Sequence, residues 1–261
     1  MPDSASQFDE RTAKKIEAIY LTPDVVAQRA RVLELLALQP GERVADLGCG
    51  PGLLAQEMAA KVGENGAVEC TDFSPSMIAL AQRRCHGLAC VNVRVGDVSL
   101  LPYGAGAFDA AVCTQVYEYV HDVALALLEL HRVLRPGGRA LVVDTDWESC
   151  VWESSDRARM HRMIDMWDTH CAHPRLPRTL ATMLECAGFR EVGVDVIPLV
   201  NARYDADTYS YAMIGVIAKY ATKLLDAGET RAWAEDLHAH GRDGRYFFSL
   251  NRYAFSCRKA A

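Results

Sequence analysis

Apolar positions along this chain of 261 residues follow two patterns: short continuous runs, and longer stretches with helical periodicity. Between about Gly41 and Asp146 the two patterns alternate, which is typical of strands followed by amphipathic helices. This rhythm predicts a parallel sheet, because parallel neighbours need a long, usually helical crossover between them. We expect strands at residues 43–47, 67–71, 91–95, 108–113 and 139–145, and helices at 53–61, 75–85 and 122–134.

The pattern changes after Asp146. Two helical stretches come first, followed by an alternating strand, two further helical stretches and a long aromatic strand. A strand pair separated by helices indicates an antiparallel end of the sheet with an inserted helical cap. Two more helical stretches precede the first strand. The expected helices are 9–19, 23–37, 154–170, 176–187, 205–222 and 228–239, and the expected strands are 189–199 and 245–257.

Composition and charge exclude several classes of protein. Half of the residues are apolar and the formal net charge is −6, as in ordinary globular proteins. Lys and Arg are scattered rather than clustered with aromatic residues, which argues against a nucleic-acid partner. No apolar run reaches the roughly 20 residues of a membrane span, and the start MPDSASQFDERTAKK lacks a secretory pattern. We therefore expect a cytoplasmic protein without a membrane span.

The nine cysteines do not indicate a metal centre or a disulfide framework. None forms a C-x-x-C pair, and their number is odd in a chain without a secretion signal. His170, Cys171 and His173 lie close together in sequence but lack a fourth suitably spaced ligand. We expect no metal site.

A glycine-rich segment is the strongest local signal. Residues 44–52 read VADLGCGPG, at the end of the first expected strand and the start of a helix. Glycines allow a sharp turn and close approach of a ligand, and the helix N-terminus offers unpaired N–H groups. Asp72 ends the second strand, where a carboxylate can accept both hydroxyls of a ribose. Asp97 ends the third, where it can accept a hydrogen bond from an adenine amine.

These segments together resemble the class I S-adenosylmethionine-dependent methyltransferases, in particular the small-molecule branch called methyltransferase type 11 or ubiquinone/menaquinone-biosynthesis-like. The resemblance covers about residues 40–146 and is carried by VADLGCGPG, CTDFSPSMIALAQ, VGDVSLLPYGAGAFDAAVCTQVYEYV and HRVLRPGGRALVVDT. It implies a Rossmann-like α/β fold with a seven-stranded, mostly parallel sheet of order 3-2-1-4-5-7-6, its last strand antiparallel. It also implies an N-terminal helical lid (1–40), a core (41–200 and 245–261) and a cap insertion (201–244).

The resemblance implies S-adenosyl-L-methionine as the cofactor and a small molecule as the methyl acceptor. Asp46 and the loop would hold the methionine part, Asp72 the ribose, and Asp97 and Val98 the adenine edge. Thr114 and Gln115 would face the sulfonium end, and Tyr20 would close over the cofactor. The expected cofactor-binding residues are Tyr20, Asp46, Gly48, Cys49, Gly50, Gly52, Asp72, Phe73, Met77, Asp97, Val98, Thr114 and Gln115.

The expected acceptor side follows from position after the strand ends and from the aromatic residues of the cap and the last strand. Ligands of open α/β sheets bind beyond the carboxyl ends of the strands, which favours polar and aromatic residues after the fourth and fifth strands. The expected catalytic bases are Asp146, His170 and His173, and the expected substrate-binding residues are Tyr117, Trp147, Trp152, Tyr209 and Phe247. An aromatic-rich pocket suits an apolar or planar acceptor, although the same residues could form the cap's own core.

Three alternatives remain open. Arsenite methylation would need cysteines that converge on one pocket, for which Cys49, Cys113, Cys150 and Cys171 are candidates. An NAD-dependent oxidoreductase is disfavoured, because the loop reads G-x-G-x-G rather than G-x-G-x-x-G. A non-catalytic cofactor-binding protein would need a cap that leaves no room for a substrate. The acceptor atom (O, N, S or C) and the oligomeric state are undetermined.

Overall fold

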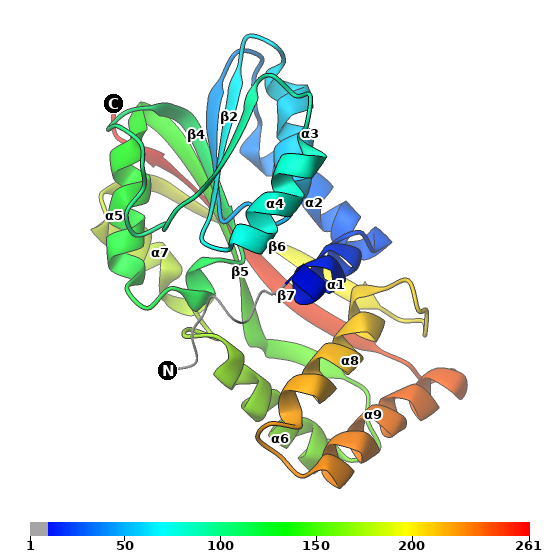
Figure 1. The fold of residues 1–261 in the computed structure, drawn as a ribbon. Coiled ribbons are helices and arrows are strands. Elements are labelled where there is room, and N and C mark those ends of the chain that lie inside the picture. The colour runs from blue at the N-terminus through cyan, green and yellow to red at the C-terminus, as the bar shows by residue number, and fades with distance from the viewer. Residues whose placement is uncertain (1–9) are drawn as a thin grey trace.

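The computed structural model describes residues 10–261, and its centre is a seven-stranded sheet with helices on both faces (Figure 1). The strand order is β3-β2-β1-β4-β5-β7-β6, and β7 runs antiparallel to both of its neighbours. The predicted sheet order and the antiparallel last strand are therefore confirmed. The strands are β1 (Arg43–Leu47), β2 (Ala67–Asp72), β3 (Val91–Val95), β4 (Phe108–Thr114), β5 (Leu134–Trp152), β6 (Phe189–Asn201) and β7 (Phe248–Lys259).

The helices divide between the two faces of the sheet and a separate layer. Helices α2, α3 and α4 share one apolar cluster with the sheet, and α5 and α7 share another with its opposite face. In the expected helix after β2, Ser74 is the N-cap, its Oγ accepting from Met77 N at 3.4 Å, and Pro75 is the first helical residue. The helices are α1 (Glu10–Tyr20), α2 (Pro23–Leu36), α3 (Leu53–Val62), α4 (Pro75–Arg84), α5 (Val123–Val133), α6 (Arg157–Trp167), α7 (Pro177–Cys186), α8 (Tyr209–Ala221) and α9 (Ala227–Arg242), with 3₁₀ turns at Tyr117–Tyr119 and Asp168–His170.

The fifth strand extends well beyond its predicted range of 139–145. It pairs with β4 along its first part and with β7 to Trp152, with a register shift between Asp146 and Val151. This extension leaves the main sheet and leads toward α6, α8 and α9 (Figure 1). Pairing with β7, which local periodicity does not report, accounts for the extra length.

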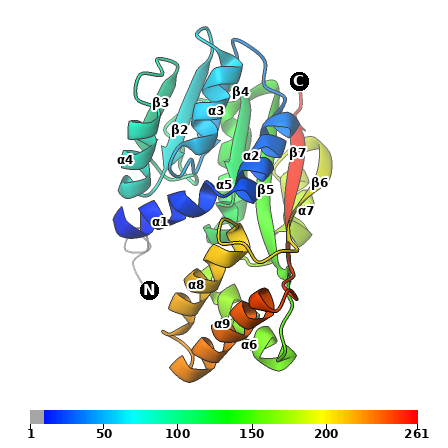
Figure 2. The same ribbon diagram turned by 90° about the vertical axis from the view of Figure 1, so that its right-hand side faces the viewer.

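Helices α6, α8 and α9 pack together in a layer beneath the carboxyl ends of the strands (Figures 1 and 2). Their shared apolar cluster includes Met163, Ile217, Trp233 and Leu237. Because α6 contributes to this cluster, we propose a cap of α6, α8 and α9, wider than the expected insertion at 201–244. Helix α1 contacts α4 on one side and α8 on the other, so it bridges core and cap.

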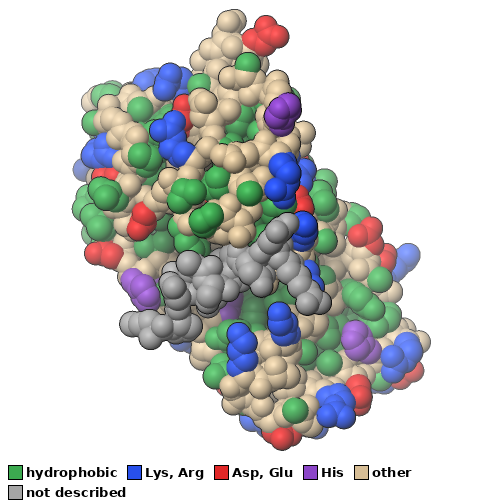
Figure 3. Space-filling view, in the orientation of Figure 1, with side chains coloured by type: hydrophobic (Ala, Val, Ile, Leu, Met, Phe, Trp, Pro, Cys, Tyr) green, Lys and Arg blue, Asp and Glu red, His purple; other side chains and the backbone are tan. Residues whose placement is uncertain are grey.

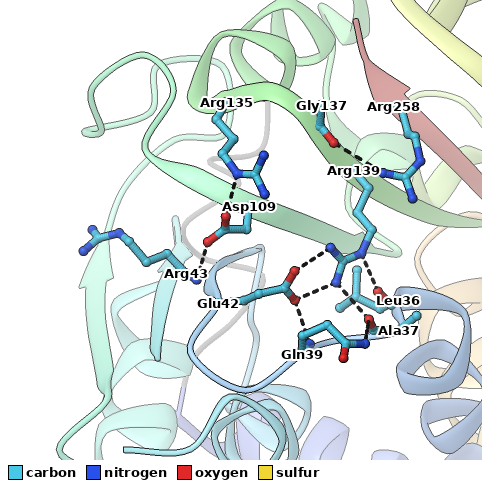
Figure 4. A network of polar contacts seen from close by, with 10 residues as sticks. All are labelled: Leu36, Ala37, Gln39, Glu42, Arg43, Asp109, Arg135, Gly137, Arg139 and Arg258. Atoms are coloured by element: carbon cyan, nitrogen blue, oxygen red, sulfur yellow. Dashed lines mark hydrogen bonds and ion pairs between the residues drawn. The ribbon is translucent and has the colours of Figure 1, made fainter. Parts of the chain in front are cut away.

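A polar network holds α2 against the opposite end of the sheet (Figure 4). Arg139 Nε donates to Leu36 O at 2.7 Å, its Nη2 donates to Ala37 O at 3.0 Å, and the guanidinium pairs with Glu42 at 2.7 Å. These bonds satisfy carbonyls that the last turn of α2 leaves without helical partners. The network fixes the C-terminal end of α2. The first turns of this helix therefore lie over the carboxyl ends of the strands.

None of the helices within residues 10–261 is long and apolar enough to cross a membrane. On the face drawn in Figure 3, Lys and Arg side chains lie in several separate groups with acidic side chains among them. Absence of a nucleic-acid partner stays a prediction.

Candidate functional site

A cavity of about 880 Å³ lies at the carboxyl ends of β1, β2 and β4 and is bordered by α1, α2 and α8. It therefore lies where ligands bind in open α/β sheets. Asp46 and Gly52 are the two expected cofactor residues that do not line it. Those that do are Tyr20, Gly48, Cys49, Gly50, Asp72, Phe73, Met77, Asp97, Val98, Thr114 and Gln115.

The glycine loop and Asp72 are joined by hydrogen bonds. Gly50 N donates to Asp72 Oδ2 at 2.9 Å, and Ser74 N donates to Asp72 Oδ1 at 2.9 Å. Each carboxylate oxygen therefore keeps further acceptor capacity for a ligand hydroxyl. Burial raises the pKa of Asp72, and the two backbone donors oppose that rise. A Cβ added at Gly50 would meet no atom within 4 Å, so this part of the loop borders open space.

Gly52 is required for the packing of two helices and does not line the cavity. Its φ is +77°, and a Cβ there would lie 2.9 Å from Ala81 Cα of α4. Only glycine combines this left-handed conformation with so close an approach of two helices. The last glycine of the motif thus sets how α3 begins beside α4.

Asp46 lies behind the loop at the end of β1. It is 1% exposed, and its Oδ2 has no hydrogen-bond partner. Burial, and then the neighbouring Asp72, raise its pKa to about 7. A buried carboxyl oxygen without a partner is costly, so this position favours a cationic or hydrogen-bond-donating ligand beside it.

The part of the cavity that is expected to hold the adenine is exposed to solvent near Asp97 and apolar near Met77. Asp97 is exposed, and its Oδ1 accepts a hydrogen bond from Ser99 N at 2.8 Å. Phe73 is 45% exposed at the cavity, whereas Met77 packs with Ala13 of α1 and Leu80. Helix α1 therefore covers this side of the cavity.

Gln115 follows β4 in a conformation that non-glycine residues rarely adopt. Its φ is +55°, its N–H donates to Val143 O at 2.6 Å, and its Nε2 donates to Thr145 Oγ1 at 3.3 Å. Surrounding bonds hold this strained residue at the cavity wall, and such strain concentrates at functional sites.

Two of the three expected bases do not reach the cavity. Asp146 pairs with Arg178 (Oδ2 to Nε, 2.9 Å) and does not line it, because its strand directs it toward α7. His173 is held outside by its own N–H, which donates to Glu118 O at 2.9 Å, and by its Nε2, which lies 3.3 Å from His121 O. The expectation that both face the acceptor is corrected.

His170 is the expected base that lines the cavity. Its Nδ1 lies 2.5 Å from Trp167 O, and a carbonyl only accepts, so Nδ1 carries the proton. Nε2 is therefore an acceptor, and it is buried without a partner. The ring stacks on Trp167 at 3.9 Å and meets Trp147 edge-on at 4.9 Å. Burial lowers its pKa to about 4, so the ring is neutral at physiological pH.

The expected acceptor-binding residues separate into two groups. Trp147 and Tyr209 line the cavity. Tyr117 instead lies in the core beneath α5, and Trp152 packs within the cap, where its Nε1 donates to Tyr246 Oη at 3.1 Å. Phe247 is 41% exposed and lies outside the cavity lining. The last three positions are corrected: Tyr117 and Trp152 are packing residues and Phe247 lies on the surface, because chain position alone does not decide which side chains face the cavity.

Sequence reasoning missed Arg252 and Gln28, which line the cavity and are hydrogen-bonded to each other. Arg252 lies on the same face of β7 as the buried residues Leu250 and Ala254. Gln28 lies on the buried face of α2, between Val25 and Val32. A polar residue at a core position of an otherwise apolar pattern was the signal that could have found both.

Behind the cavity wall, Glu118 and Asp144 form a buried acidic pair. Glu118 N donates to Asp144 Oδ1 at 3.4 Å, and Thr145 N donates to Glu118 Oε2 at 3.2 Å. Burial raises the pKa of both carboxyls, and the Glu118 carboxylate further raises the pKa of Asp144. Neither lines the cavity.

Of the nine cysteines, Cys49 and Cys171 line the cavity. Within residues 10–261, no group of three or more His, Cys, Asp or Glu side chains is arranged to hold a metal ion. The structure thus adds no observation in favour of arsenite as a substrate.

Comparison with known proteins identifies relatives for this arrangement. Residues 45–142 match the family model described as a methyltransferase domain. An uncharacterized 37.1 kDa protein in transposon TN4556 of Streptomyces fradiae is 36% identical over 97% of this chain and 70% of its own length. A demethylmenaquinone methyltransferase of Beutenbergia cavernae is 36% identical over 54% of this chain and 58% of its own. A 2-phytyl-1,4-naphtoquinone methyltransferase of Synechococcus elongatus is 40% identical over 41% and 48%.

The chain therefore spans only about half the length of these two quinone methyltransferases. Solved structures agree on the fold. Phosphoethanolamine N-methyltransferase 2 of Haemonchus contortus, in complex with S-adenosylhomocysteine, matches 98% of this chain and 58% of its own (TM-score 0.65, 15% identity). A methyltransferase structure from Bacillus halodurans matches 90% of this chain and all of its own (TM-score 0.63, 18% identity).

Proposed function

Because this chain belongs to the class I S-adenosylmethionine-dependent methyltransferases, we propose that the cavity described above, which is continuous, holds both the cofactor and a small-molecule methyl acceptor. One observation carries the proposal. The cavity runs from Gly50 and Asp72 at one end to Trp147, His170 and Tyr209 at the other. Its volume of about 880 Å³ lies near the upper limit of small-ligand sites, roughly 300–1,000 Å³.

The residues at the glycine-loop end fit S-adenosylmethionine. Asp46 does not line the cavity, but it lies directly behind the loop, where its carboxylate would attract the cationic amino group of the methionine part. Asp72 presents two carboxylate oxygens, each already fixed by one backbone N–H, which suits a pair of ribose hydroxyls. Open space at Gly50 leaves the backbone accessible there. Phe73, Met77, Asp97 and Val98 would enclose the adenine, and Thr114 and Gln115 would border the sulfonium end.

The opposite end suits an apolar or planar acceptor. Its walls carry Trp147, Trp167, Tyr209 and Met213, all less than 10% exposed. Flat aromatic walls favour flat ligands through stacking and edge contacts. The quinone substrates named for two relatives support this class of acceptor.

When bound, S-adenosylmethionine supplies an electrophilic methyl group on its sulfonium. The protein's part is to hold the acceptor atom in line, about 3 Å from that methyl, and to exclude water. Lid helices α1 and α2 and the cap would provide the exclusion. The neutral His170 offers its Nε2 as an acceptor for an O–H or N–H of the substrate. It would thereby orient the attacking atom and receive the proton that this atom loses.

A labelled-methyl assay tests the proposal. The purified chain is incubated with methyl-labelled S-adenosylmethionine and a panel of quinols, phenols, indoles and arsenite, and products are identified by mass spectrometry. We expect transfer to planar organic acceptors and a loss of at least about tenfold in kcat/KM for His170→Ala. The matched control, His173→Gln, should retain the wild-type rate. Methylation of arsenite alone, or of no acceptor by a chain that binds the cofactor, would contradict it.

A further inference from the structure

Arg252 is a buried cation in the wall of the cavity. It lies on β7, opposite Thr145 of β5, and its exposed fraction is 0%. Strand β7, red in Figure 2, runs between β5 and β6 from the cap to the C-terminal end of the chain. Fully buried arginines are rare unless a counter-charge accompanies them. Arg252 therefore needs an explanation that packing does not supply.

The protein uses one edge of this guanidinium and leaves the other unused. Nη1 donates to Gln28 Oε1, and Cζ lies 5.0 Å from the ring centroid of Tyr209. Nε and Nη2 are buried and have no hydrogen-bond partner. These two nitrogens form the edge of an arginine that binds both oxygens of a carboxylate in parallel. Gln28 and Tyr209 thus hold the guanidinium in place while that edge stays available.

No acidic side chain within residues 10–261 forms an ion pair with Arg252. Glu118 and Asp144 are close enough to interact with it electrostatically, but their hydrogen bonds go to backbone N–H groups. Their carboxyls also lie behind the wall, whereas Arg252 lines the cavity. Neither carboxyl forms a hydrogen bond with the guanidinium, so Nε and Nη2 have no partner in the protein and could pair with a carboxylate that enters the cavity.

The place of Arg252 in the sheet separates it from the cofactor loop. The loop follows β1, and β4 and β5 lie between β1 and β7. Neighbouring strands lie about 4.8 Å apart, so the two backbones are about 14 Å from each other. Trp147 and Tyr209, which line the acceptor end, share an apolar cluster with residues of β7, and Tyr209 contacts Arg252 directly.

We propose that Arg252 binds a carboxylate of the methyl acceptor through Nε and Nη2, so that the acceptor is an apolar or planar carboxylic acid. This rests on the proposed function, because it assigns the acceptor end of the same cavity. A carboxylate supplies two oxygens at the spacing of the free edge and one negative charge for one cation. A phosphate would bring more charge than the single arginine and its neighbours can compensate.

Matched acids and amides test this without knowledge of the natural acceptor. Benzoate, 1-naphthoate and indole-3-acetate are compared with benzamide, 1-naphthamide and indole-3-acetamide, with phosphate as a further probe. Binding is measured by calorimetry in saturating S-adenosylhomocysteine, for the wild type, Arg252→Met, and the control Arg258→Met, an exposed arginine of the same strand. We expect at least one acid to bind about 10- to 100-fold more tightly than its amide. The preference should persist in Arg258→Met and disappear in Arg252→Met.

Thermal unfolding separates this role from a structural one. Because Arg252 has no direct ion-pair partner, Arg252→Met should leave the Tm of the ligand-free chain nearly unchanged or higher, whereas loss of a structural cation would lower it. Equal binding of acids and amides, preference for phosphate, or loss of S-adenosylhomocysteine binding in Arg252→Met would each overturn the inference. If the wild type fails to bind S-adenosylhomocysteine, the proposed function itself fails.

Discussion

Arg84 of α4 pairs with Glu17 of α1 at 2.5 Å, and the same guanidinium donates from Nε to Pro51 O at 3.0 Å. One side chain thus joins α1 to the glycine loop. Both partners are about one-fifth exposed, so water weakens the pair only in part. The position of α1 over the cofactor end depends on this contact and on the packing of Met77 with Ala13.

Glu17→Gln should therefore loosen the lid. Because an ion pair of this exposure contributes about 1 kcal/mol or less, we expect S-adenosylhomocysteine to bind about three- to fivefold more weakly, with little change in Tm. Calorimetric titration measures the affinity for S-adenosylhomocysteine, and thermal unfolding measures the Tm. Glu34→Gln, at an exposed ion pair on α2, is the matched control. Equal affinities for both variants would show that α1 does not act as a lid.

Asp46 should make cofactor binding pH-dependent. Burial raises its pKa to about 7, so the carboxyl is increasingly protonated below pH 7 in the ligand-free protein. A cationic amino group favours the carboxylate, so binding must release that proton. The Kd for S-adenosylmethionine should rise as pH falls below 7, approaching tenfold per unit. Titrations from pH 5.5 to 8.5 should show this slope in the wild type and a flat profile in Asp46→Asn.

His170 should make the wild type less stable in acid. Its folded pKa of about 4 lies below its ordinary value, so the unfolded chain binds more protons between about pH 6.5 and 4. The free energy of unfolding should therefore fall as pH is lowered through this window, by about 3 kcal/mol. Urea unfolding of the wild type and His170→Gln at several pH values isolates the contribution of His170 to the free energy of unfolding. The same slope in both proteins would mean that the ring is not buried as a neutral base.

Gly52→Ala should destabilise the core. The φ of +77° and the 2.9 Å approach to Ala81 both oppose a side chain, and we expect a loss of about 1–3 kcal/mol. Gly215 is the matched control: it is exposed in α8 with no atom within 4 Å of an added Cβ. Gly215→Ala should stabilise by about 0.5–1 kcal/mol. Chemical denaturation of both variants decides whether the motif glycine serves packing.

The sequence predicted those parts of the molecule that local patterns encode. The sheet order came from a resemblance over about residues 40–146, and the helix expected at 75–85 begins at Pro75. Eleven of the thirteen expected cofactor residues line the cavity, because motif residues at strand ends share one edge of the sheet. Their individual roles stay predictions.

The acceptor end could not be predicted in the same way, because it depends on long-range packing. Whether Trp147 or Trp152 faces the cavity is set by how β5 and β7 pair beyond the main sheet. Asp146 is paired with Arg178, a residue of a later helix that no local pattern connects to it. Arg252 and Gln28 stand 224 positions apart, yet bond to each other in the folded chain.

Calorimetric titration of S-adenosylhomocysteine into the wild type, Asp72→Ala and the exposed control Glu64→Ala tests the central claim most directly. Asp72 ties the glycine loop through Gly50 and would carry the ribose, so its loss should weaken binding at least about 100-fold. Glu64→Ala should bind as the wild type does. Undiminished binding by Asp72→Ala would contradict the account, because the cofactor would then lie elsewhere.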